Sequence, residues 1–548
     1  MTFAKPLTAL AAALLALTGT PADAEAQKRP NFLIIIADDL GYSDIGAFGG
    51  EIATPNLDRL ALTGLRLTGF HTAPTCSPTR AMLLSGTDNH LAGLGSMAET
   101  LAPNQRGKPG FEGYLRPDVA SLAERLSAGG YRTLFSGKWH LGLKPEQDPH
   151  ARGFQRSFAL LQGGHNHFGQ GLSTDPARGD TYTLDGKPLA QLPADFYSSD
   201  VFATKLIEAL NGTGGAKKPF FAYLAFTAPH WPLQARPEDI AKYRGRYDAG
   251  FDVLRAQRLK RQRELGLISP QTVAHSTKVP RGHWDALTAA EQRQAARDME
   301  IYAAMVDRLD QNVGRVLDAL RASGELDNTV ILFMADNGAE GLDVEGGGLK
   351  LLEARLARAD NSFANRGTAT SYVAYGPGWA QAATAPSWSV KGYATEGGTR
   401  TVSFLNWRGI ARQGQTSNAF LSVADIAPTF LDLAGIARDG TSFAGRAVRP
   451  ITGKSWAPFL AGKADRVYGV EEAIGTELFG SRAIRQGDWK ITDPGDGKWR
   501  LFNLAEDPGE TQDLSLAEPE RFTLLLAAWD SYAERVGVIL PSETLYRP

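Results

Sequence analysis

The chain of 548 residues has a single cysteine, Cys76. It therefore cannot form an internal disulfide, which excludes the class of small folds held together by cross-links. A lone thiol is a liability in an oxidising compartment unless it is buried or used. The presence of Cys76 thus needs an explanation before any motif is considered.

An excess of charge of one sign is also lacking. The chain has 58 Lys and Arg against 60 Asp and Glu, a formal net charge of −2. This balance gives no general attraction to nucleic acid or anionic membranes, so any anion must be recognised by a local group of cations. Residues 254–267 carry five basic side chains, and we interpret them as a solvated helix face and not as a nucleic-acid patch.

Long apolar runs are missing as well, and only the first residues have the features of a processing signal. Lys5 precedes an apolar run over residues 7–17 that is too short for a membrane span, and Ala22-Asp23-Ala24 offers small residues for cleavage. We predict a signal peptide over residues 1–24, with export to the periplasm or the medium. An uncleaved anchor and a disordered tail are the alternatives. No later segment predicts a membrane span.

Several short apolar runs end in polar residues. They cover residues 32–37, 131–136, 220–227 and 329–335, and they lead into Asp38-Asp39, Lys138 to His140, His230 and Asp336-Asn337. Runs of this kind predict strands buried on both faces. Helical patterns lie between them, at residues 119–128 and 291–321. The alternation predicts an α/β fold with a large, mostly parallel or mixed sheet sandwiched by helices.

Composition changes near residue 455. Residues 467–473, 481–492 and 498–504 are typical of short strands separated by turns, and residues 521–536 of a terminal helix. We therefore predict a catalytic domain over residues 25–454 and a smaller antiparallel domain over residues 455–548.

The acidic residues at the strand ends suggest a metal site. Asp38, Asp39, Asp336 and Asn337 offer only oxygen ligands, which suit Ca²⁺ or Mg²⁺ and not zinc. Each of them alone could be a turn or cap residue. Two such groups, each following a buried strand, favour a metal, because the carboxyl ends of strands in open α/β sheets form binding sites.

Cys76 begins the segment Cys76-Ser77-Pro78-Thr79-Arg80, just before an apolar helical stretch. Pro78 suits the first turn of a helix, so Cys76 is expected at a helix N-terminus, where anions are favoured. If this segment is taken alone, a buried structural cysteine is a competitive alternative. The segment resembles the Cys-x-Pro-x-Arg signature of the type I, formylglycine-dependent sulfatases of the alkaline phosphatase superfamily.

The resemblance extends over about residues 30–515. Within the family, the chain is similar to the bacterial arylsulfatases. The matching segments are Asn31 to Asp39, Gly137 to Gly142, Ala228-Pro229-His230, Ala335 to Gly338, Lys391-Gly392 and Glu396 to Arg400. One departure is Thr87, where many relatives have a second arginine. The resemblance implies an enzyme that hydrolyses sulfate esters, here expected to be aryl sulfates, with sulfated sugars and alkyl sulfates as open alternatives. It also favours Ca²⁺ over Mg²⁺.

The resemblance also implies roles for the site residues. Cys76 is converted to formylglycine by a formylglycine-generating enzyme; its hydrate attacks sulfur and yields a sulfated hemiacetal. Arg80, Lys138 and Lys391 stabilise the sulfate. His230 protonates the leaving oxygen together with Lys391, and His140 is the base that expels sulfate. Residue 76 is also expected to contact the metal.

His165 and His167 are weaker candidates, either for the substrate mouth or for an incidental surface loop. Two other functions stay open. A formylglycine-dependent phosphodiesterase or phosphonate monoester hydrolase would share the nucleophile and the metal. A non-catalytic protein that binds sulfated ligands would leave Cys76 unmodified, but it would not need this complete set of titratable groups.

Overall fold

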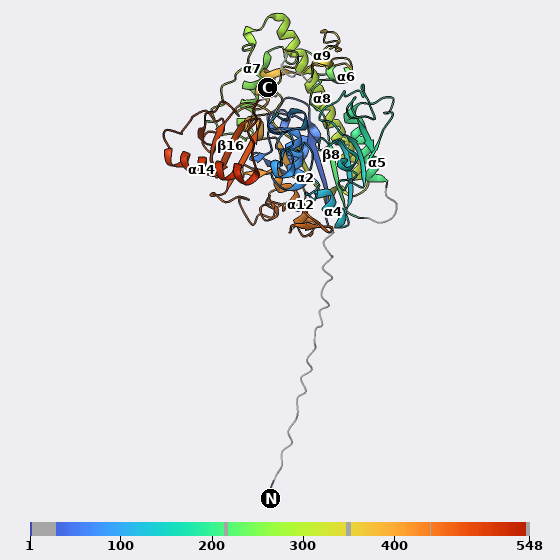
Figure 1. Cartoon of the computed structure of the whole chain (residues 1–548), viewed down its shortest axis with the longest axis vertical. Coiled ribbons are helices and arrows are strands. Elements are labelled where there is room, and N and C mark those ends of the chain that lie inside the picture. Colours follow the sequence, from blue (N-terminus) through green and yellow to red (C-terminus); the bar gives the residue numbers. More distant parts are fainter. Residues whose placement is uncertain (3–28, 213–217, 347–351, 439, 544–548) are drawn as a thin grey trace.

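A computed structural model of the chain describes residues 1–2, 29–212, 218–346, 352–438 and 440–543 (Figure 1). Residues 3–24 of the predicted signal peptide lie outside the described residues. In the described part, no helix is both long and apolar enough to cross a membrane.

A ten-stranded sheet runs through the protein, with strand order β11-β2-β10-β9-β1-β8-β4-β5-β6-β7. The central pairs β9–β1, β1–β8, β8–β4 and β4–β5 are parallel, and β10 is antiparallel to β9. The prediction of a large, mostly parallel sheet is confirmed. In order along the sheet the strands are β11 (Thr416–Ser417), β2 (Leu65–Leu67), β10 (Ser403–Asn406), β9 (Thr329–Ala335), β1 (Asn31–Ala37), β8 (Phe220–Ala225), β4 (Arg132–Lys138), β5 (Arg156–Leu160), β6 (Tyr182–Leu184) and β7 (Lys187–Pro188).

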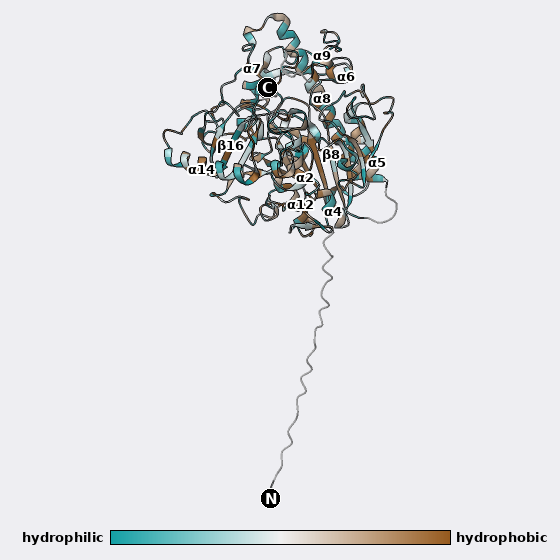
Figure 2. Cartoon of the chain, viewed as in Figure 1, coloured by the Kyte–Doolittle hydropathy of each residue, from teal (hydrophilic) through white to brown (hydrophobic). Residues whose placement is uncertain are grey.

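Strand β1 shows why its sequence is continuously apolar. Leu33 and Ile35 pack into the core on one face of the sheet, and Phe32, Ile34 and Ile36 pack into the core on the other. Successive side chains of a strand point to opposite faces, so a strand covered on both sides must be apolar at every position. The brown central strands of Figure 2 follow this rule.

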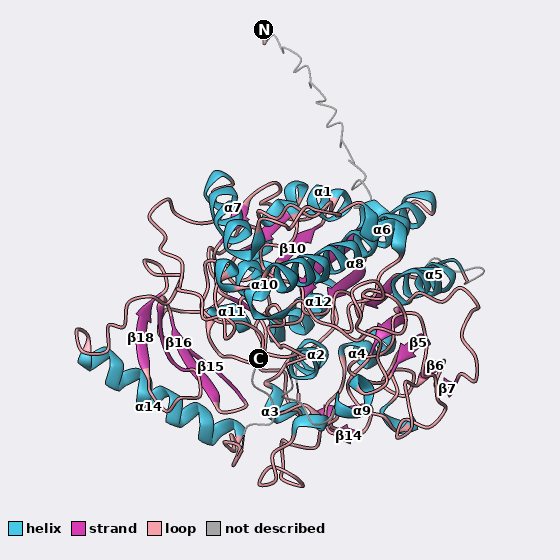
Figure 3. Cartoon of the chain, turned by 90° about the horizontal axis from the view of Figure 1, so that it is seen from above, coloured by secondary structure: helices cyan, strands magenta, loops and turns pink. Residues whose placement is uncertain are grey.

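Helices cover both faces (Figure 3). The first face packs against α1 (Pro55–Thr63), α5 (Ser198–Asn211), α6 (Pro237–Ala241), α7 (Gly250–Glu264), α8 (Ala289–Ala322) and α10 (Gly376–Ala383). The second face packs against α2 (Cys76–Ser85), α3 (Asn89–Ala92), α4 (Leu122–Ala128), α12 (Ile426–Leu433) and α13 (Ala457–Leu460). Besides 3-10 turns, this part of the described chain has the short strands and α-helices β3 (Phe70–His71), β12 (Leu421–Ser422), β13 (Ser442–Phe443), β14 (Arg446–Ala447), α9 (Glu353–Leu356) and α11 (Glu396–Thr399).

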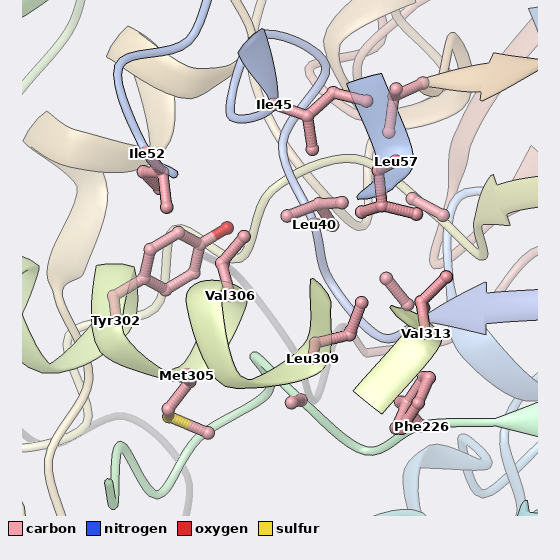
Figure 4. Close-up of a cluster of buried hydrophobic side chains, with 14 of the residues drawn as sticks. Leu40, Ile45, Ile52, Leu57, Phe226, Tyr302, Met305, Val306, Leu309 and Val313 are labelled. Carbon is pink, nitrogen blue, oxygen red and sulfur yellow. The ribbon is translucent and has the colours of Figure 1, made fainter. Parts of the chain in front are cut away.

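The long helix α8 begins and is buried as its sequence predicts. Its N-cap, Thr288, forms a capping box with Glu291, which satisfies free N–H groups of the first turn. Val306, Leu309 and Val313 recur at helical spacing and form the apolar stripe that contacts Leu40 and Leu57 in the core of the first face (Figure 4).

A second, antiparallel sheet contains β15 (Ala473–Leu478), β16 (Ser481–Gln486), β17 (Trp489–Asp493) and β18 (Arg500–Asn503), and α14 (Pro519–Val536) packs against it. A smaller antiparallel unit was therefore predicted correctly. The strand predicted at residues 467–473 was wrong. Residues 467–472 precede β15, because Gly469 and Glu472 close a turn there. Trp456 and α13 pack into the core of the main sheet, and the boundary at residue 455 stays a prediction.

Candidate active site

The polar residues that follow the central strands meet at one edge of the sheet. The parallel register sets Ala37 opposite Ala335, so that Asp38 and Asp336 follow side by side. The backbone continues this pairing beyond the strands, since Asp336 N–H donates to Ala37 O at 3.2 Å and Asp38 N–H to Ala228 O at 3.1 Å. The sheet itself therefore collects the side chains that the sequence predicted to lie together.

Four buried side chains form a group that could hold a cation. Ligand atoms of Asp38, Asp39, Asp336 and Cys76 lie within 4.8 Å of one another. Asn337 adjoins them: its Nδ2 donates to Asp39 Oδ1 at 2.6 Å, while its buried Oδ1 has no hydrogen-bond partner among the described residues. A buried carbonyl oxygen without a partner is costly unless it has a ligand. These oxygens fit a hard divalent ion such as Ca²⁺ or Mg²⁺.

Cys76 is the first residue of α2 and is 2% exposed. Its Sγ lies 3.2 Å from Asp38 Oδ1 and 3.8 Å from Asp39 Oδ1. Burial, reinforced by the charges of Asp336 and Asp38, raises the pKa of the Cys76 thiol well above its ordinary value. The unmodified residue is therefore a neutral thiol, and thiols are poor nucleophiles compared with thiolates.

Three cations are paired with the carboxylates. Arg80 Nε and Nη2 donate to Asp336 Oδ2 at 3.1 and 2.7 Å, and Lys138 Nζ donates to Asp38 Oδ2 at 2.6 Å. Lys391 Nζ lies 2.9 Å from Asp39 Oδ2 and 3.1 Å from Glu340 Oε2. These four carboxylates exceed the three cations by one negative charge. A divalent ion would reverse the sign and suit the site to an anionic ester.

The neighbouring carboxylates also affect the pKa of Asp39. Burial raises the pKa of Asp39 to about 7; Lys391 opposes this, and the charges of Asp38, Glu340 and Asp336 add to it. Packed carboxylates repel one another, and a bound cation removes that repulsion.

One histidine borders this group, and a second one pairs with a separate glutamate. His230 Nε2 lies 3.5 Å from Asp39 Oδ2, and the ring of His230 packs against Trp231 with centroids 4.5 Å apart. Burial, together with the charges of Lys391 and Lys138, lowers the pKa of His230 well below its ordinary value. A bound anion would oppose this effect, because a negative charge favours the imidazolium form. The other histidine, His140, has its Nε2 3.0 Å from Glu99 Oε1.

Comparison with known proteins identifies the family. The family model described as Sulfatase matches residues 30–436. The chain is a member of the sulfatase family. It is 48% identical over 528 residues to an uncharacterised sulfatase of Schizosaccharomyces pombe, covering 93% of this chain and 95% of that protein. It is also 39% identical over 450 residues to the arylsulfatase of Klebsiella aerogenes, covering 82% and 95%.

Solved structures agree with the fold. The crystal structure of Ps i-CgsB in complex with k-i-k-neocarrahexaose superposes with a TM-score of 0.67 at 25% identity, covering 95% of each chain. The sulfatase is thus a hydrolase of sulfate esters, with the mixed sheet and the C-terminal four-stranded sheet of its family.

The structure corrects one of the two expectations for His165 and His167. Both side chains are 1% exposed, so they are not incidental histidines of a surface loop. His165 Nε2 bonds Thr227 Oγ1 at 2.7 Å, and His167 lies between Ser198 Oγ at 2.8 Å and the backbone oxygen of His230 at 3.1 Å. They support the segment that carries His230.

The basic stretch is also only partly a solvated face. Arg258 of α7 is 1% exposed and pairs with Asp44 and Glu51, whereas Lys260 and Arg261 are exposed. The pairs hold α7 against the loop that follows β1.

Other motif residues lie outside the centre of the site. Glu396 of α11 pairs with His71 of β3 at 2.9 Å and with Lys490 of β17 at 2.9 Å, so it links α11 and β3 to the C-terminal sheet. Sequence reasoning missed Glu99 and Glu340, which contact His140 and Lys391. The position of Glu340, three residues after Asn337, was the only local signal for it.

Proposed function

We propose that this sulfatase hydrolyses aryl sulfates with formylglycine at position 76 and with Ca²⁺ beside it. The observation that carries the proposal is the place of Cys76, a neutral buried thiol at the start of α2 among Asp38, Asp39 and Asp336. Such a thiol has no evident chemistry of its own. Formylglycine as its hydrate supplies a hydroxyl nucleophile there, and the cation would bind Asp38, Asp39, Asp336, Asn337 and residue 76.

The cations of the site are proposed to hold the sulfate group. Lys138, Lys391 and His230 surround the carboxylates next to Cys76 and would bind the sulfate oxygens. Arg80 donates to Asp336 and to the backbone oxygen of Lys138 at 2.7 Å, so part of its contribution is to fix these two residues.

We assign the two proton transfers to His230 and His140. His230, with Lys391 beside Asp39, would protonate the leaving oxygen. His140 would take the proton from the hydroxyl of residue 76 when sulfate leaves.

An aromatic leaving group is supported by the apolar side chains near His230. Trp231 packs against His230 and against Tyr372, with centroids 5.9 Å apart in the second pair. Tyr372 belongs to a cluster that also contains Met97 and Phe479. Apolar and aromatic walls favour apolar ligands. The name of the Klebsiella aerogenes relative, arylsulfatase, supports the same substrate class.

The proposal is tested by the covalent state of residue 76 and by the preference between two substrates. Protein from a host with a formylglycine-generating enzyme should carry an aldehyde or its hydrate on tryptic peptide 67–80. It should turn over an aryl sulfate faster than an aryl phosphodiester. A faster phosphodiester reaction would instead favour a phosphodiesterase or phosphonate hydrolase.

The Cys76→Ser variant, provided that it is not oxidised, has one hydroxyl and cannot eliminate sulfate. We expect at most one equivalent of product per site and a sulfate adduct on peptide 67–80. Cys76→Ala is the matched control and should give neither. Sustained turnover by the serine variant would overturn the proposed mechanism.

A further inference from the structure

The two ring nitrogens of His140 have different surroundings. Nε2 lies 3.0 Å from Glu99 Oε1, whereas Nδ1 is buried and has no hydrogen-bond partner among the described residues. An ionised carboxylate can only accept, so Nε2 must carry the hydrogen in this contact. In the neutral ring Nδ1 then keeps its lone pair and can accept a proton.

The backbone leaves His140 little freedom. Its φ is 57°, in the left-handed region that non-glycine residues rarely occupy, and its N–H donates to Leu161 O at 3.2 Å. The ring lies over Gly163, where a Cβ atom would come within 2.4 Å of Cε1 of His140. The backbone therefore fixes where the ring lies, and the contact with Glu99 decides which nitrogen is free.

Glu99 is held separately from the ring. It lies in the short 3-10 helix Ala98–Thr100, which follows Met97 of the apolar cluster that contains Tyr372 and Phe479. Its side chain is 41% exposed, against 10% for His140, so Glu99 is on the solvent side of the ring. Partial desolvation beside the ring would raise the pKa of Glu99, but the charge of the protonated His140 ring and its hydrogen bond lower it to about 2. Glu99 is therefore ionised at neutral pH.

We propose that Glu99 is a positioning residue for His140. By accepting a hydrogen bond from Nε2–H, it fixes the ring with Nδ1 as the free base. In the sulfated hemiacetal proposed at residue 76, the proton of the free hydroxyl would form an N–H bond at Nδ1. The electron pair of its O–H bond would form the C=O bond of the aldehyde, and the C–O bond to sulfate would break with its electron pair leaving on sulfate. The resulting imidazolium keeps its Nε2–H bond to Glu99, whose negative charge stabilises the cation without taking the proton. This inference rests on the proposed role of His140 as the base.

The experiment compares Glu99→Ala and Glu99→Gln with wild type, using protein whose conversion of Cys76 has been quantified. Glu99→Ala removes both the acceptor and the charge, and we expect kcat for an aryl sulfate to fall by about 10- to 100-fold, part of the effect of a general base. Glu99→Gln keeps an acceptor oxygen without the charge and should recover part of the loss. Glu208→Gln is the matched control, because Glu208 of α5 is 56% exposed and pairs only with Lys205 among the described residues.

Two readouts separate positioning from a general structural role. The first turnover should survive in Glu99→Ala while the steady state slows, so a sulfate adduct should accumulate on peptide 67–80. In a His140→Ala background, Glu99→Ala should have no further effect, since Glu99 acts through the ring. An equal loss in both backgrounds would overturn the proposal, as would unchanged kcat in both Glu99 variants.

Failure of the proposed function would look different. It would show as absence of the aldehyde in active wild-type protein, or as no accumulation of adduct in His140→Ala itself. Normal kinetics of Glu99→Ala beside an impaired His140→Ala would reject only the positioning role.

Discussion

The stability of the joint between the main sheet and the C-terminal sheet should depend on the protonation of one buried histidine. His90 of α3 lies between Asp88 Oδ1 at 3.0 Å and Glu477 Oε2 of β15 at 3.1 Å, and its side chain is 0% exposed. Tyr532 of α14 donates to Asp88 at 2.8 Å. A single imidazolium thus bridges two carboxylates, one from each part of the protein.

The magnitude follows from the pKa. Burial alone would lower the pKa of His90, but the hydrogen bonds and charges of Asp88 and Glu477 raise it to about 9. Because the folded pKa exceeds the unfolded pKa of about 6.5, the stabilisation is fully present below pH ~6.5 and is lost as the pH rises through about 9. The difference corresponds to at most about 3 kcal/mol, or on the order of 100-fold in an opening equilibrium. If the two parts separate while Asp88 stays beside His90, a smaller part of this stabilisation is lost.

Hydrogen exchange of the amides of β15 and β16 measures this opening. After correction for the intrinsic rate, protection should fall between pH 6 and pH 9.5 by up to about 100-fold. Glu477→Gln removes one carboxylate, so its decline should be smaller and centred at a lower pH. His90→Gln should show little change over the same range. Equal pH dependence in wild type and His90→Gln would refute the reasoning.

Three further outcomes are expected. Chelation of divalent cations should abolish turnover of an aryl sulfate, and Ca²⁺ or Mg²⁺ but not Zn²⁺ should restore it; full activity of metal-free protein would contradict the site. His230→Ala should slow aryl sulfates with poor leaving groups by about 10²–10⁴-fold and activated ones less, and an equal loss across leaving groups would exclude a general acid. Lys391→Ala leaves Asp39 and Glu340 buried without their cation and should cost about 3–5 kcal/mol of stability. Lys260, whose side chain is 78% exposed, is the control, and Lys260→Ala should change thermal unfolding little. Equal unfolding midpoints for the two variants would contradict the predicted cost of removing Lys391.

The sequence determined the strands and the placement of the acidic residues. The runs that form β1, β8 and β9 are apolar at nearly every position, which only a sheet covered on both faces requires. Strand β4 has a mixed sequence but is buried at every position after Arg132. The parallel arrangement then brings the polar residues after each strand to one edge. Local chemistry was enough for this, because the side chains in question are adjacent in sequence to the strands that carry them.

Tertiary structure alone decided which side chains pair. Lys391 meets Asp39 and Glu340, and Glu99 meets His140, because loops far apart in sequence close over the same sheet edge. The burial of His165 and His167 depended in the same way on packing against Thr227 and Ser198. Periodicity reports which face of a single element is buried, but it does not report which side chain of another element lies opposite. That is set by strand order and register, which a single segment does not encode.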